Sequence, residues 1–317
     1  MIIPSQIELA ETHKRISGLI NKTPVLTSHF LNKIYNADLF FKCENFQKVG
    51  AFKIRGAINT LLSLPTEKLV NGVATHSSGN HAAALALAAR LLKSEAFIVM
   101  PKTAPEIKKK AVKGYGGKIT FCEPTLEARE TTCNRIVEET GAYFVHPYNN
   151  IDIVKGQATC AKEIFDSGFK LDYLIAPVGG GGLLSGSALS AFYYSPSTKV
   201  IGAEPKGADD AFRSIRDNKI YPSINPKTVA DGLLTSLGEI TFELIKKYVD
   251  EIITVGEDSI IRAMRDIWER MKIVIEPSAA VPLAVVLENQ EKFKNKSIGV
   301  ILSGGNIDLD NFNWNSN

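Results

Sequence analysis

The chain has 317 residues, of which 44% are hydrophobic and 22% charged, and this balance excludes a disordered or fibrous protein. Its 37 Lys and Arg are interspersed with 34 Asp and Glu, so no nucleic-acid-binding surface is indicated. The sequence has no signal-peptide pattern and no apolar run of the about 18 residues that a membrane span needs, so we expect a cytoplasmic protein without a membrane segment.

Short β-rich runs alternate with amphipathic stretches along the chain, which predicts an α/β protein with parallel sheets. The runs LIAPV and IGVIL are wholly apolar, so we expect helices on both faces of their sheet. The triplet Lys108 to Lys110 is predicted to be the solvated face of a helix. The expected strands, in chain order, are VATHS (73–77), AFIVM (96–100), KITFC (118–122), YFVHP (143–147), LDYLIAPV (171–178), KVIGAE (199–204), EIITV (251–255) and SIGVILS (297–303).

The cysteines are scattered along the chain without a CxxC pair. This spacing indicates neither a zinc site nor a disulfide framework, so we expect buried free thiols. They are Cys43, Cys122, Cys133 and Cys160.

Three turns rich in glycine or small residues follow predicted strands: SSGNH at 77–81, GGGG at 179–182 and SGGN at 303–306. Ligands bind at the carboxyl ends of parallel strands, so these turns are predicted to meet at one crevice. Four consecutive glycines before a helix favour a phosphate-binding turn, although a tight strand-to-helix connection is the structural alternative.

The glycine turn lacks two common nucleotide-binding patterns, which limits the kinds of phosphate ligand that it could bind. The dinucleotide pattern GxGxxG fails because Leu184 or Ser185 occupies its last position, and the P-loop pattern is absent. Glu204 nevertheless stands where a ribose-binding acid would, so an NAD-dependent oxidoreductase remains the alternative enzyme class.

Lys53 opens a predicted helix and has Phe52 beside it. A pyridoxal-phosphate enzyme needs a lysine, a phosphate anchor, a partner for the pyridine nitrogen and donors for the substrate carboxylate. The lysine and the three turns together could meet these requirements. A non-catalytic amino-acid-binding protein would not need such a lysine.

Six motifs in this order carry a resemblance: FFKCENFQKVGAFKIRGA, THSSGNHAAALA, GGGGLLSG, GAEP, ADG and ILSGGN. They resemble the fold-type II (tryptophan synthase β-like) pyridoxal-phosphate enzymes, within the serine racemase and serine/threonine dehydratase family. The resemblance extends from residue 21 to residue 308. It implies a homodimer whose large domain comprises residues 1–71 and 148–317, a small mobile domain of residues 72–147, and a cofactor in the cleft between two parallel-type α/β domains.

The resemblance also implies roles for individual residues. Lys53 matches the Schiff-base lysine, Phe52 the aromatic residue on the cofactor, and Asn80 the ligand of the phenolic oxygen. Ser303 matches the hydroxyl facing the pyridine nitrogen. The implied phosphate cup is Gly179, Gly180, Gly181, Gly182 and Leu183, and the implied substrate-carboxylate loop is Ser77, Ser78, Gly79 and His81.

The implied activity is serine racemisation, dehydration of L-serine or L-threonine, or both, with 3-hydroxyaspartate dehydration as the alternative. A neutral hydroxyl such as Ser303 does not keep the pyridine nitrogen protonated, which suits elimination or proton exchange better than transamination. Racemisation needs a second proton donor opposite Lys53, and Ser78 is the candidate. The alternative is that Ser78 only binds the substrate carboxylate.

The stretch GAEPKGADD resembles the family's divalent-metal site, with oxygen ligands from Glu204, the Ala208 carbonyl and Asp210 for Mg²⁺ or Ca²⁺. A solvated acidic loop is the alternative. The nucleotide pocket of animal serine racemases has serine and glutamine where this chain has His29 and Ala83. The resemblance therefore implies weak or no activation by ATP.

Tyr148 stands where the animal enzymes carry an asparagine and dehydratases often place an aromatic residue, which implies a shifted substrate preference. The sequence suggests no catalytic or metal-binding partner set for His13, His76 or His146.

Overall fold

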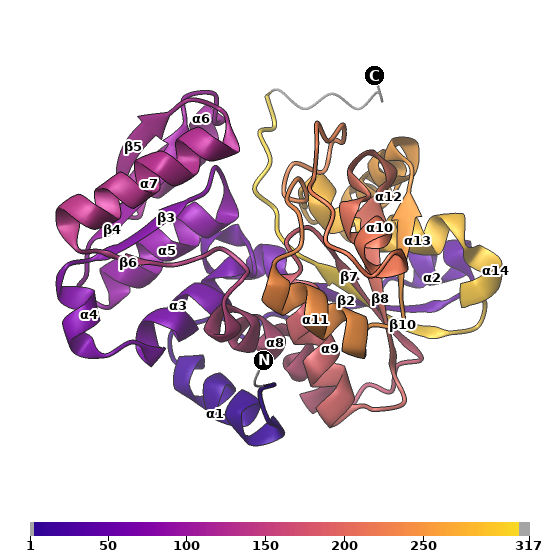
Figure 1. Ribbon diagram of the computed structural model, residues 1–317. Coiled ribbons are helices and arrows are strands. Elements are labelled where there is room, and N and C mark those ends of the chain that lie inside the picture. Colours follow the sequence, from indigo (N-terminus) through magenta and orange to yellow (C-terminus); the bar gives the residue numbers. More distant parts are fainter. Residues whose placement is uncertain (1–2, 311–317) are drawn as a thin grey trace.

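The computed structural model describes residues 3–310, which form two β-sheets surrounded by helices (Figure 1). The larger sheet has six strands in the order β1-β2-β10-β7-β8-β9 and is parallel except for the antiparallel pair β1-β2. Its strands are β1 (Val25–Leu26), β2 (Asp38–Cys43), β7 (Tyr173–Pro177), β8 (Lys199–Pro205), β9 (Glu251–Val255) and β10 (Ser297–Leu302).

The smaller sheet has four parallel strands in the order β5-β4-β3-β6. They are β3 (Val73–His76), β4 (Ala96–Pro101), β5 (Lys118–Cys122) and β6 (Tyr143–Phe144), and the helices between them are α5 (Asn80–Leu91), α6 (Glu106–Gly114) and α7 (Leu126–Thr140). All eight predicted strands are thus present, which confirms the α/β class. Strands β1 and β2 were not predicted.

Helices cover both faces of the larger sheet, as its apolar strands predicted. Along β10, Val300 and Leu302 belong to the hydrophobic core under α12 and α13, whereas Ile301 between them belongs to the core under α8 and α9. Successive side chains of a strand point to opposite faces, so these two cores flank the sheet. The remaining helices are α1 (Gln6–Ile16), α2 (His29–Tyr35), α3 (Lys53–Ser63), α4 (Thr66–Val70), α8 (Ile151–Asp166), α9 (Gly182–Tyr194), α10 (Asp210–Arg216), α11 (Glu239–Tyr248), α12 (Glu257–Met271), α13 (Pro277–Glu288) and α14 (Gln290–Phe293).

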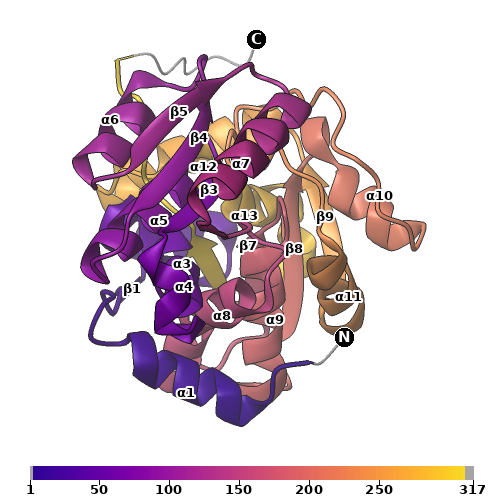
Figure 2. The ribbon, with the colours of Figure 1, turned by 60° about the vertical axis from the view of Figure 1, so that its left-hand side comes forward.

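Helix α3, which begins at Lys53, lies between the two sheets (Figures 1 and 2). Its Ile54, Ile58 and Leu61 share a hydrophobic core with α5, while its glycine at 56 packs against Gln157 of α8. The first residue of α3 is therefore held by elements from both sides of the molecule.

A buried cluster of charged side chains fixes α3 from the side of the larger sheet. Arg55 donates to both oxygens of Glu44, at 2.7 and 2.8 Å, and to both oxygens of Glu163, at 2.7 and 2.9 Å. Lys42 donates to Glu163 at 2.6 Å and to the Thr23 carbonyl at 2.7 Å. All four charged side chains are buried, so each depends on its partners for the hydrogen bonds that water would otherwise supply.

All four cysteines are buried free thiols, as expected. Within residues 3–310, no helix combines the length and the apolar character that crossing a bilayer requires.

Candidate active site

A cavity of about 430 Å³ lies between the two sheets, at the carboxyl ends of β3, β7 and β10. The three turns therefore meet at one cavity, as the sequence predicted. The lining includes all the residues that the sequence proposed for cofactor and substrate: Phe52, Lys53, Ser77, Ser78, Gly79, Asn80, His81, Gly179, Gly180, Gly181, Gly182, Leu183 and Ser303.

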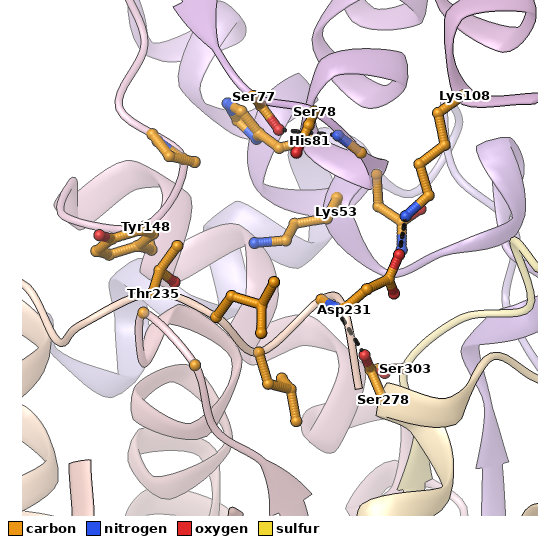
Figure 3. A pocket seen from close by; sticks show the side chains of 18 of the residues that line it. Lys53, Ser77, Ser78, His81, Lys108, Tyr148, Asp231, Thr235, Ser278 and Ser303 are labelled. Atoms are coloured by element: carbon orange, nitrogen blue, oxygen red, sulfur yellow. Dashed lines mark hydrogen bonds and ion pairs between the residues drawn. The ribbon is translucent and has the colours of Figure 1, made fainter. Parts of the chain in front are cut away.

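Lys53 projects its amine into this cavity, between the loop of Ser77 and Ser78 on one side and Ser303 on the other (Figure 3). Burial lowers the pKa of Lys53 to about 8, although the charge of Glu276 raises it. Its nitrogen also lies 5.0 Å from the centre of the Phe52 ring. An amine whose pKa is lowered in this way is more readily neutral, as nucleophilic or proton-abstracting chemistry requires.

The four-glycine turn leads into α9 and leaves no room for side chains. Gly181 has a φ of +87°, and a Cβ there would lie 2.8 Å from the Cβ of Thr241. A Cβ on Gly180 would lie 2.3 Å from ring carbons of Tyr148. The N-terminus of α9, at Gly182, borders the cavity with unpaired backbone N–H groups, which fits the phosphate of pyridoxal phosphate.

The SSGN loop places a second helix N-terminus at the cavity. Helix α5 begins at Asn80 without a side-chain cap from Gly79, so its first N–H groups are available to an anion such as a carboxylate. Ser77 Oγ accepts from the Gly79 N–H at 3.4 Å. His81 is buried in the first turn of α5, and burial together with the charge of Lys53 lowers its pKa well below the usual value, so it is neutral.

Two histidines without an assigned role lie near the site. His76 lines the cavity, and His146 Nδ1 accepts the backbone N–H groups of Tyr148 and Asn149 at 3.3 and 2.9 Å. Burial, with smaller contributions from His76 and Lys53, lowers the pKa of His146 to about 4. The neutral His146 ring packs edge-on against Tyr148, with ring centres 4.6 Å apart, and so supports the cavity wall.

Sequence reasoning missed several charged residues of the cavity. Lys108 is not part of a solvated face as predicted: it lines the cavity and forms an ion pair with Asp231 across the cleft, although its neighbour Lys110 is exposed. Arg129 of α7 and the buried carboxylate Glu276 also line the cavity. Lys108 looked like part of a charge run. Asp231 lies in the ADG motif but was given no role, and nothing in the local pattern marked Arg129 or Glu276.

The predicted metal ligands lie outside this cavity. Glu204 accepts the backbone N–H groups of Ala211 and Phe212, both at 2.8 Å, and burial raises its pKa to about 8. Burial raises the pKa of Asp210 to about 6. Ala208 ends a 3-10 turn between the two carboxylates. Within the described chain, no group of three or more His, Cys, Asp or Glu side chains could hold a metal ion.

The cavity brings together a lysine, a glycine turn, two helix N-termini without side-chain caps and a strand-end serine, a set of groups that fits pyridoxal phosphate. Residues 16–304 match the family model "Pyridoxal-phosphate dependent enzyme". The chain belongs to this family and, within it, to the fold-type II group of serine racemases and dehydratases. The NAD-dependent alternative is therefore wrong, and Glu204 does not mark a ribose site.

Known proteins of similar sequence and structure carry related names. The chain is 49% identical over 315 residues to a β-hydroxyaspartate dehydratase of Paracoccus denitrificans (strain Pd 1222), covering 99% of this chain and 100% of the relative. The crystal structure of serine racemase from Dictyostelium discoideum matches with a TM-score of 0.91 and 46% identity, covering 96% of this chain and 98% of the other. The structure of maize serine racemase matches with a TM-score of 0.94 and 43% identity, covering 96% and 94%.

Proposed function

We propose that this protein is a serine racemase, an L-serine/L-threonine dehydratase, or both. The observation that supports this function most directly is the Lys53 amine, which has a lowered pKa and lies inside a cavity with anion-binding helix N-termini on two sides. Its sequence relatives include serine racemases, which supports the same activity.

Each cavity residue has a proposed part in this chemistry. Bound pyridoxal phosphate would withdraw electrons from the α-carbon of the substrate amino acid. Lys53 holds the cofactor and takes the α-proton, and Ser78 exchanges a proton on the opposite face. The cofactor ligands are Phe52, Asn80, Ser303 and the cup from Gly179 through Gly182 to Leu183, and the substrate carboxylate binds at Ser77, Ser78, Gly79 and the N-terminus of α5, with His81 behind it.

Two substitutions test this function. Lys53→Ala is expected to abolish keto-acid formation and racemisation and to remove the cofactor's lysine-dependent visible absorption. Ser78→Ala is expected to abolish L-to-D conversion of serine while L-serine dehydration continues, because elimination from the L-isomer needs only Lys53 at the α-proton. Substantial activity in Lys53→Ala would refute the function, and an equal fall of both reactions in Ser78→Ala would make Ser78 a binding residue.

A second candidate substrate is 3-hydroxyaspartate, and Arg129 favours it. Arg129 lines the cavity, donates to the Thr125 carbonyl at 3.3 Å, and forms no ion pair with any carboxylate of the described chain. A second substrate carboxylate would supply such a partner. If so, Arg129→Met should lower kcat/KM for 3-hydroxyaspartate far more than for serine. Equal losses for both substrates would count against this candidate.

The strands of the smaller sheet all fall within residues 72–147, which supports a small mobile domain there, with residues 1–71 and 148–317 as the large domain. The Lys108–Asp231 ion pair joins the two parts at the cavity and would hold them closed over the substrate.

A structural Mg²⁺ or Ca²⁺ is proposed at Glu204, the Ala208 carbonyl and Asp210. Burial raises the pKa of both carboxyls and so disfavours their ionised forms, and a bound cation would stabilise those ionised forms, which supports the assignment.

The proposal also includes a cytoplasmic homodimer that ATP activates weakly or not at all. The exposed apolar side chains of Phe30, Ile34 and Val274 support a subunit contact. His29 is exposed at the start of α2, and Ala83 is buried in α5. Sedimentation with and without ATP, beside activity measurements, tests the subunit number and the effector.

A further inference from the structure

Glu276 is a carboxylate in an unusual position. It precedes α13 and lines the cavity with only 3% of its surface exposed. No Lys, Arg or His of the described residues forms an ion pair with it. A buried charge without an ion-pair partner lowers the stability of a fold, so a leucine of similar size would be the more stable choice. Its presence at the cavity therefore calls for a functional explanation.

The strongest contact of Glu276 is with the side-chain amide of Asn80. Asn80 Nδ2 donates to the two carboxylate oxygens at 2.8 and 3.1 Å. At the other end of the amide, Asn80 Oδ1 accepts from Asn306 Nδ2 at 2.9 Å, and the same Asn306 nitrogen donates to the Val49 carbonyl at 2.7 Å. Glu276 therefore contacts the nitrogen end of the amide and Asn306 contacts its oxygen end.

The carboxylate is held against the SGGN turn. A Cβ on Gly304 would lie 2.7 Å from Glu276 Oε1, and the Glu276 N–H donates to the Gly304 carbonyl at 3.0 Å. Gly304 directly follows Ser303, which lines the same cavity. The first glycine of this turn thus makes room for the carboxylate beside Ser303.

The two orientations of an asparagine amide have almost the same shape but opposite polarity. With Glu276 ionised, a flipped Asn80 would bring its carbonyl oxygen to the carboxylate oxygens and its NH₂ group to the Asn306 NH₂ group. Both contacts would be repulsive. Burial raises the pKa of Glu276 to about 7, with Asp231 as a second cause, and the Asn80 hydrogen bond lowers it, so the contact with Asn80 favours the ionised form.

We propose that Glu276 is a positioning residue that fixes the polarity of the Asn80 amide, so that the second N–H of Asn80 is presented to the phenolic oxygen of pyridoxal phosphate. The inference rests on the proposed function, from which it takes the cofactor and the role of Asn80. It adds that Asn80 binds as a donor because Glu276 occupies the other N–H.

Cofactor affinity of the cofactor-free protein tests this role, measured by titrating pyridoxal phosphate and following absorbance. Glu276→Leu removes both acceptor oxygens and is expected to weaken binding about tenfold, the usual effect of losing a hydrogen bond to a charged group. Glu276→Gln keeps one acceptor oxygen for Asn80 and is expected to restore most of the affinity. Glu288→Leu, at the far end of α13, makes the same change away from the cavity and should bind as the wild type does.

The decisive comparison repeats Glu276→Leu in an Asn80→Ala background. There it is expected to change affinity less than about twofold, since residues that act through one another are not additive. Tenfold weakening in both backgrounds, or none in either, would overturn the inference. A merely structural role would lower the melting temperature of the cofactor-free protein, whereas we expect Glu276→Leu to maintain or raise it.

If Glu276→Leu does not fold, the exchanged pair Asn80→Asp with Glu276→Gln gives the same information. It restores a donor and an acceptor to the contact with reversed polarity. It should therefore fold but bind the cofactor as poorly as Asn80→Ala, and wild-type affinity would refute the need for a donor at residue 80. If the wild type itself fails to bind pyridoxal phosphate, the proposed function fails rather than this inference.

Discussion

Replacing Arg55 with methionine tests the buried charged cluster that fixes the start of α3. The guanidinium binds both oxygens of Glu44 and both oxygens of Glu163, and all three side chains are buried. Burial alone would raise the pKa of Glu163, but hydrogen bonds and charges from its partners, Arg55 among them, hold it well below the usual range. Without Arg55, Glu163 keeps Lys42 at 2.6 Å, but Glu44 loses its cation. One buried carboxylate left uncompensated costs about 3–5 kcal/mol of unfolding free energy.

Urea unfolding of the cofactor-free protein, followed by circular dichroism and fluorescence, measures this loss. Arg15→Met on α1 is the matched control, because Arg15 binds the neutral Asn59 at 2.6 Å. It should cost less than about 1.5 kcal/mol, the range of an ordinary hydrogen bond. Adding Glu44→Gln to Arg55→Met should recover part of the loss by removing the unpaired charge. A loss below about 1 kcal/mol in Arg55→Met, or full additivity with Glu44→Gln, would refute the reasoning.

Three further predictions follow from single contacts. Lys108→Met and Asp231→Asn should each change the free energy of unfolding by less than about 1 kcal/mol, because the ion pair is partly exposed, but each should raise KM. A double variant with a higher KM than either single variant would show that the two residues do not act as a pair. His146 has a folded-state pKa of about 4, below the ordinary value, so the unfolded chain binds more protons as the pH falls through 6.5. Between pH 7.5 and pH 5, the wild type should therefore lose about 2 kcal/mol more unfolding free energy than His146→Asn does, as measured by urea unfolding. Equal losses in the two proteins would contradict the lowered pKa of His146. A chelator should lower the melting temperature of the wild type, and Mg²⁺ or Ca²⁺ should restore it, whereas the double variant Glu204→Gln with Asp210→Asn should respond to neither. If the chelator leaves the melting temperature of the wild type unchanged, the proposed metal site is wrong.

The location of the cavity was predictable because each part of it has a local signature. Ser77, Gly179 and Ser303 each follow a strand that its apolar run identifies, and parallel strands bring their carboxyl ends to one edge. Strand β2 was missed because its run LFFKC contains a lysine, whereas a buried strand is expected to be apolar. Lys42 is buried all the same, since Glu163 pairs with it.

The charged residues of the cavity could not be predicted in this way, because their partners lie far away in the chain. Asn80 and Glu276 are separated by 196 positions, and Lys108 and Asp231 by 123. The helix pattern gave Lys108, Lys109 and Lys110 one common environment. Only the packing of α6 over the cleft distinguishes the first from the others.

The position of the glycine turns was predictable from the sequence, but the side chains that pack against these glycines were not. The GGGG turn was interpreted as a phosphate-binding turn and the SGGN turn as part of the same crevice, and residues 179–182 and Ser303 line the cavity as expected. However, a Cβ on Gly180 would meet the ring of Tyr148, and one on Gly304 would meet the carboxylate of Glu276. In both turns a glycine therefore accommodates a neighbouring side chain, not only a ligand. A substitution at Tyr148 would consequently change the space beside the phosphate turn, so its effect on substrate preference must be measured together with its effect on cofactor affinity.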